Sequence, residues 1–154
     1  TRYHVADWEW SLAKQLKVEK PRPHRFVEVE CADGENVILD LKHKVGRSTI
    51  PHGRFTAAAR EALWNDLHYV RGMQPRADIL LRWHVHYFGH CGNADKTAIT
   101  CPCLQGPGSE FGSENFTDVV DFGLVAIEVT PDGEAIWKPH LAVLPTYKAK
   151  AWKI

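Results

Sequence analysis

A short apolar run that ends in two histidines places the strongest constraint on the fold of this chain. Asp78 precedes the consecutive apolar residues 79–81, and His84 and His86 follow them. A run of this length without polar alternation is typical of a strand that is buried on both faces. If the strand continued, the two imidazoles would point to the same side, because alternate side chains share a face. Such a pair can bind a metal ion or an anion, and it is equally compatible with two ordinary surface histidines.

The segments before this run predict a strand–helix–strand unit. Val37–Leu41 favours a strand that leads to His43, and residues 54–71 favour a helix that Gly72 closes. If the two strands are parallel neighbours, their carboxyl ends lie at one edge, where sites of open α/β sheets form. We therefore expect three histidines at this edge. The predicted helix carries one apolar stripe of residues at helical spacing: Phe55, Ala59, Ala62, Leu63, Leu67 and Val70.

The remaining segments predict strands on both sides of this unit and a helix at the start of the chain. Apolar spacing favours a helix over residues 7–17. Alternation and turn residues favour further strands at 25–31, 97–100 and 121–129, and a strand that begins at 135. The late strands suggest a second sheet packed over the first. We expect a single α/β domain over residues 1–154, with residues 148–154 as a tail.

Composition favours an ordinary soluble protein and excludes several classes of partner. Nineteen basic residues balance nineteen acidic ones, so no net charge attracts nucleic acid or an anionic membrane. No apolar run approaches the roughly 20 residues that cross a bilayer, and no secretory signal precedes the four cysteines. We therefore expect reduced thiols and a cytoplasmic location.

Two segments resemble motifs of the calcineurin-like metallophosphoesterases. Residues 39–43, Leu-Asp-Leu-Lys-His, and residues 77–86, Ala-Asp-Ile-Leu-Leu-Arg-Trp-His-Val-His, are similar to the last two histidine motifs of that family. The resemblance extends from about Tyr3 to Trp137 and implies the C-terminal half of a four-layer α/β/β/α sandwich with mixed sheets. Trp83 stands where the family has glycine.

The resemblance implies the hydrolysis of a phosphoester substrate by water that two divalent metal ions activate. The ions are manganese, iron or zinc in this family, and such pairs stabilise both the attacking and the leaving oxygen. By motif, His43 and His84 would bind one metal and His86 the other, with His84 at the catalytic centre. His52 and Arg54, in the segment that follows His43, are candidates for contacts with the substrate phosphate.

The family motifs that supply the carboxylate ligands have no match in this sequence. Two dications need anionic ligands to offset their charge, so we expect this chain alone to have little phosphoesterase activity. Binding to a separate N-terminal half, or self-association, would then complete the fold. Two alternatives remain open: a non-catalytic protein-interaction fragment, and a metal-binding structural domain. The candidate zinc ligands of the latter are His90, Cys91, Cys101 and Cys103.

Overall fold

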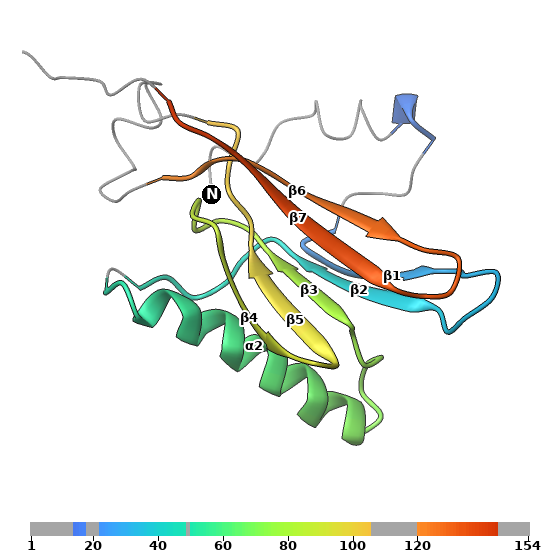
Figure 1. Ribbon diagram of the computed structural model, residues 1–154. Helices are drawn as coiled ribbons and strands as arrows, with labels where there is room; N and C mark the ends of the chain where they lie inside the picture. Colours follow the sequence, from blue (N-terminus) through green and yellow to red (C-terminus); the bar gives the residue numbers. More distant parts are fainter. Residues whose placement is uncertain (1–13, 18–21, 49, 106–119, 145–154) are drawn as a thin grey trace, which may run out of the picture.

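The chain forms a mixed α/β fold with a mixed sheet of five strands (Figure 1). The computed structural model describes residues 14–17, 22–48, 50–105 and 120–144. The five strands are β1 (His24–Val29), β2 (Val37–Lys42), β3 (Ile79–Arg82), β4 (Gly89–Asn93) and β5 (Lys96–Thr100). The helix is α2 (Gly53–Val70), and β6 (Phe122–Val129) and β7 (Ala135–Ala142) form a separate two-stranded sheet.

The strand order in the large sheet is β1-β2-β3-β5-β4. The central strands β2, β3 and β5 are parallel, while β1 and β4 pair antiparallel at the two edges. All four residues of β3 are buried, which confirms the prediction of a strand covered on both faces. The predicted β2–α2–β3 crossover is also confirmed, because β2 and β3 are parallel neighbours.

The two faces of the large sheet are covered by different elements. Helix α2 packs against β3, β4 and β5 on one face, where the buried cluster consists of Leu80 and three alanines, Ala58, Ala77 and Ala98. On the opposite face, the β6–β7 hairpin packs over Ile79, Leu81 and Ile99 through Val125 and Trp137, among others. The predicted second sheet over the first is therefore confirmed in the form of this hairpin.

Most of the predicted apolar stripe of α2 does not face the core, although Ala62 packs against the cluster of Ala58 and Leu80. Leu63 and Val70 are 58% and 82% exposed, and Phe55 and Leu67 are exposed as well. The helix instead buries Ala57, Ala58 and Asn65. Alanine methyl groups let the helix approach the sheet more closely than leucine side chains would.

Strand β4 was not predicted, because its sequence carries no strand signal. Gly89–Asn93 contains two glycines and little apolar alternation. It forms because β5 provides a pairing partner across a tight turn, in which the Asn93 side chain accepts a hydrogen bond from the main-chain nitrogen of Asp95 at 3.0 Å. Tertiary pairing therefore overrides local preference here.

The turn of the β1–β2 hairpin contacts the turn of the β6–β7 hairpin. The main-chain nitrogen of Asp33 donates to the carbonyl oxygen of Pro131 at 2.9 Å. A Cβ atom on Gly34 would lie 1.9 Å from the carbonyl oxygen of Asp132, so only glycine permits this approach. We call this contact the turn clasp. It fixes one end of the β6–β7 hairpin over the large sheet.

Some predictions fall outside the part of the chain that the structure describes. These are the helix over residues 7–17, of which only residues 14–17 are described, and the tail at 148–154. Within the described segments, no helix is both long and apolar enough to cross a membrane.

Candidate functional site

His43 and His84 lie next to each other at the carboxyl edge of the large sheet. His43 follows β2 directly, and His84 comes two residues after the end of β3. Their ring centroids are 5.5 Å apart, with an angle of 59° between the ring planes. Both side chains are exposed. The parallel pairing of β2 with β3 thus places the two imidazoles together, as the sequence predicted.

The loop that carries His84 and His86 has an unusual backbone. Strand β3 ends at Arg82, so the expected strand alternation does not extend through the two histidines. Instead, both have a positive φ angle, 77° for His84 and 61° for His86. Residues other than glycine and asparagine rarely adopt positive φ angles. Backbone strain of this kind is common at functional sites. Trp83, half-buried, packs against the core on the hairpin face.

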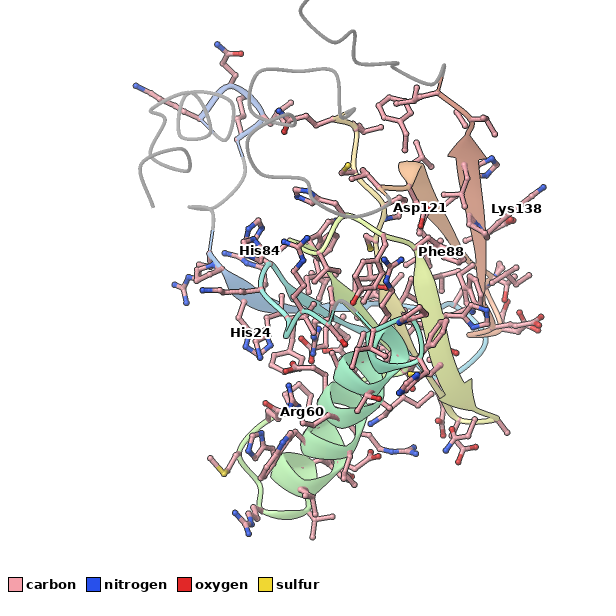
Figure 2. All side chains as sticks on the ribbon, turned by 90° about the vertical axis from the view of Figure 1, so that its left-hand side faces the viewer. His24, Arg60, His84, Phe88, Asp121 and Lys138 are labelled. Atoms are coloured by element: carbon pink, nitrogen blue, oxygen red, sulfur yellow. The ribbon has the colours of Figure 1, made fainter. Side chains whose placement is uncertain are left out.

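Asp121 holds this loop in place from just before β6. Its main-chain nitrogen donates to the carbonyl oxygen of His86 at 3.0 Å, and its carboxylate accepts from the main-chain nitrogen of Phe88 at 2.7 Å. Figure 2 shows Asp121 and Phe88 close together on the side of the hairpin. Nothing in the sequence singles out Asp121, because it stands about 35 positions after His86 and lies at the start of a predicted strand.

A buried network of charges anchors the strand ends from which His43 and His84 extend. The guanidinium of Arg82 donates to the Asp40 carboxylate at 2.7 Å and to Glu61 at 3.1 Å. Lys42 donates to the same Glu61 oxygen at 2.9 Å, and His24 pairs with Asp40 at 2.7 Å. The side chains of Asp40 and Arg82 are each 2% exposed. Sequence reasoning missed this network, since alternating charges on strands also suit a solvated face.

A cavity of about 450 Å³ lies beside this network. Its lining comes from β1, β2, β3 and α2, and it includes Trp64, His68 and Gln74 in addition to the paired charges. Among the lining groups, Asp40, Glu61, Lys42 and Arg82 already bind one another. The cavity therefore presents mainly groups whose hydrogen bonds are already made.

The two proposed substrate-binding residues stand at the start of α2. His52 is the N-cap residue, is exposed, and makes no capping hydrogen bond through its side chain. The Arg54 guanidinium lies 4.8 Å from the ring centroid of Tyr87, a residue of the loop that carries His84 and His86. The Nε atom of Arg54 is buried and has no hydrogen-bond partner among the described residues. Arg54 is thus a donor with unused capacity next to that loop.

In the part of the chain that the structure describes, His90, Cys91, Cys101 and Cys103 do not gather into a group that could hold a metal ion. All four cysteines are free thiols, and burial raises the pKa of Cys91, Cys103 and Cys101, the last to about 12. His90, the fourth candidate, instead packs its ring 4.6 Å from that of Trp137.

The donor set fits one metal ion better than two. Two imidazoles bound to a single ion at tetrahedral geometry, with metal–nitrogen distances of about 2 Å, have ring centroids roughly 5 Å apart. The 5.5 Å between His43 and His84 agrees with this spacing. In the described residues, however, no group of three or more His, Cys, Asp or Glu side chains could hold a metal ion. A complete two-metal centre therefore does not fit these residues.

Comparison with known proteins adds no further constraint, since no family model and no curated protein matches the sequence.

Proposed function

We propose that this chain contributes an imidazole pair, His43 and His84, to the divalent-metal centre of a phosphoester hydrolase. The observation that supports the proposal is the 5.5 Å contact between two imidazoles from the ends of neighbouring parallel strands. The positive φ angles at His84 and His86 add to it, because the strained loop keeps its shape at an energetic cost. We expect little activity from the chain on its own, because the sequence has no match to the family motifs that supply the carboxylate ligands.

Each residue near the pair has a separate role in the proposal. His43 and His84 hold the metal ion, and a bound divalent ion would supply a Lewis acid for the phosphoester. His86 lies on the same loop and provides a further imidazole for a second ion when carboxylates from elsewhere complete the centre. Arg54 and His52 bind the phosphate, for which the buried Nε of Arg54 is the stronger argument. Asp121 positions the loop.

Metal binding can be tested by titrating the purified chain with Mn²⁺ while recording the imidazole resonances by NMR. The proposal predicts selective paramagnetic broadening of His43 and His84 at low Mn²⁺. Loss of an outer-shell partner commonly weakens metal binding by about 10–100-fold, so His43→Ala or His84→Ala should cost at least as much. Isothermal titration with Zn²⁺ would measure that loss directly.

The matched control is His140→Ala, because His140 is an exposed histidine on β7 with no proposed role. This variant should bind Mn²⁺ and Zn²⁺ as the unaltered chain does. Equal broadening of all histidines, or unchanged affinity in His43→Ala, would contradict the metal site. Fast metal-dependent hydrolysis of bis(p-nitrophenyl) phosphate by the chain alone would contradict the expectation of low activity.

The second candidate function, a protein-interaction fragment, is favoured by a different part of the molecule. The β6–β7 sheet has only two strands, and isolated two-stranded hairpins are marginally stable in water. An unpaired strand edge is also a template on which another chain can pair. In this case the partner protein would bind at the β6–β7 hairpin and not at His43 and His84.

A further inference from the structure

The cavity beside the buried network of charges is bounded by one side of α2 and by strands of the large sheet. Helix α2 packs against β3, β4 and β5, and residues of β1, β2 and β3 complete the lining. The volume of about 450 Å³ is in the range of about 300–1,000 Å³ that is typical of small-molecule sites. Neither His43 nor His84 is among the described residues that line the cavity, so it is separate from the proposed metal site.

The ion pairs around the cavity have their negative members buried more deeply than their positive ones. The side chains of Asp40 and Glu61 are 2% and 17% exposed, whereas those of their partners His24 and Lys42 are 37% and 35% exposed. The remaining cation, Arg82, is buried and already donates to Asp40 and Glu61. The carboxylates are thus less accessible to a ligand than the imidazole and the ammonium group.

The accessible side chains of the lining retain hydrogen-bonding capacity, most of it as donors. An ammonium group has three N–H donors, and among the described residues Lys42 uses one of them, on Glu61 at 2.9 Å. Trp64 and Gln74 also line the cavity, and their side chains make no hydrogen bond within the described part of the chain. An indole can only donate, while an amide can donate and accept. The lining therefore favours a ligand that is rich in acceptors.

Trp64 and His68 form an aromatic platform on the cavity side of α2. They stand one helical turn apart, and their ring centroids are separated by 5.5 Å with an angle of 33° between the planes. The neighbouring Asn65 fixes this turn of the helix, because its buried amide donates to the carbonyl oxygen of Pro75 and accepts from the main-chain nitrogen of Ala77. Trp64 is nevertheless 46% exposed. A planar ring can stack on this indole, and such contacts add to the energy of area burial.

We propose that this cavity binds an aromatic ligand that carries one carboxylate. The ring of the ligand stacks on Trp64, and its carboxylate accepts hydrogen bonds from Lys42 and Gln74. Among the described lining residues, Lys42 is the accessible side chain with a full positive charge at neutral pH. One negative charge is therefore matched, whereas the second charge of a phosphate monoester would not be. Because the cavity and the proposed metal site share no residue, either proposal can fail without the other.

NMR of the full chain tests the site, with 2-naphthoate as the probe and EDTA present so that no metal ion holds the carboxylate. The indole N–H resonance of Trp64, identified by its loss in Trp64→Ala, should shift and saturate with a Kd below about 1 mM. The neutral 2-naphthalenemethanol keeps the rings and lacks the charge. It should bind at least about tenfold more weakly, because it cannot accept a charge-assisted hydrogen bond from Lys42. Acetate, which has the charge without the rings, should not saturate the site at these concentrations.

Two substitutions separate the parts of the site. Lys42→Gln should weaken 2-naphthoate binding at least about tenfold, through loss of the charged donor. Trp64→Ala, followed through the amide of Asn65, should weaken it at least about fivefold, through loss of the stacking surface. The matched control is Tyr69→Ala, since Tyr69 is an exposed aromatic residue of the same helix outside the lining. That variant should bind 2-naphthoate as the unaltered chain does.

Several outcomes would overturn the proposal. These are equal affinity for 2-naphthalenemethanol, unchanged affinity in Lys42→Gln or Trp64→Ala, and no shift of the Trp64 indole up to about 1 mM probe. Shifts confined to His43 and His84 would also overturn it. Because Trp64 is exposed, Trp64→Ala tests the site even where Lys42→Gln weakens the fold.

Discussion

The α2 face of the large sheet contains a buried ion pair beside its apolar cluster, whereas the described core of the hairpin face is a cluster of hydrophobic residues. Toward α2, Asp40 and Arg82 are buried as ions that depend on each other. Toward the hairpin, Leu81 and Ile99 are buried among apolar side chains. A buried ion pair is costly to break and is not strongly stabilising compared with an apolar replacement. Apolar burial contributes in proportion to the area removed from water.

Because of this difference, the free energy of unfolding should respond differently to paired substitutions on the two faces. On the α2 face, loss of one charge leaves its partner desolvated and unpaired, so a second substitution can repair the first. On the hairpin face, loss of a side chain leaves a cavity that a substitution elsewhere does not fill.

Arg82→Met should reduce the free energy of unfolding by about 3–5 kcal/mol, because it removes the buried guanidinium from Asp40 and leaves that carboxylate only His24 as an ion-pair partner. The double variant with Asp40→Asn should be more stable than the sum of the two single effects predicts, by at least about 1 kcal/mol. Urea unfolding followed by circular dichroism measures all three variants. Strict additivity would mean that the pair contributes no coupling.

Leu81→Ala should cost about 3 kcal/mol, since Leu81 is 8% exposed and packs beneath the hairpin. Combination with Arg82→Met is uninformative because the residues are adjacent, so the partner substitution is Trp137→Phe. We expect no rescue in that double variant. Recovery of stability would show that the hairpin face also contains a repairable pair.

Asp66→Asn tests the pH dependence of the α2 face. The hydrogen bond from the buried Lys96 ammonium lowers the pKa of Asp66 below its ordinary value. Stability from a lowered carboxyl pKa is present above the unfolded value of 3.8 and is lost as the pH falls through the folded value. Because Asp66 is largely solvated, the difference at pH 7 should be under about 1 kcal/mol. The difference in free energy of unfolding between Asp66→Asn and the unaltered chain should vanish at pH 2. The effect of Trp137→Phe should not change with the protonation of Asp66.

Leu63→Lys should change stability by less than about 0.5 kcal/mol, because the side chain is 58% exposed on the outside of α2. Ala58→Leu, at a residue that is 1% exposed, is the matched substitution on the inner side. Overpacking there should cost about 1–3 kcal/mol. Thermal unfolding of both variants would decide whether α2 is oriented as described. A large loss from Leu63→Lys would restore the sequence-based stripe as the buried face.

The sequence predicted the three central strands and the parallel pairing of the first two, because local pattern and tertiary environment agree there. The apolar run 79–81 is buried on both faces, and α2 and Gly72, with a φ angle of 68°, lie where capping and spacing placed them. The orientation of α2 was not predictable, because its leucines and its alanines both recur at helical spacing. The packing of the helix against the sheet decides which set is buried. The five-stranded mixed sheet agrees with the expected class; the four-layer sandwich stays a prediction.

Of the candidate site, the sequence predicted the approach of His43 to His84, since that follows from parallel neighbouring strands. It did not predict how the loop after β3 is built. The loop with positive φ angles at His84 and His86 is hydrogen-bonded to Asp121, a residue distant in the sequence. The shape of that loop is therefore a tertiary property, and the metal roles of the three histidines stay a prediction.

The turn clasp has a consequence for how fast the chain reaches its native state. It joins Asp33 to Pro131, residues about 100 positions apart, and the hairpin cannot settle until β1 and β2 have formed. Contacts between such distant residues close a large loop, whose entropic cost is met before the contact stabilises anything. We therefore expect the hairpin to dock late in folding. An alanine at Gly34, which blocks the clasp, should then accelerate unfolding far more than it slows refolding.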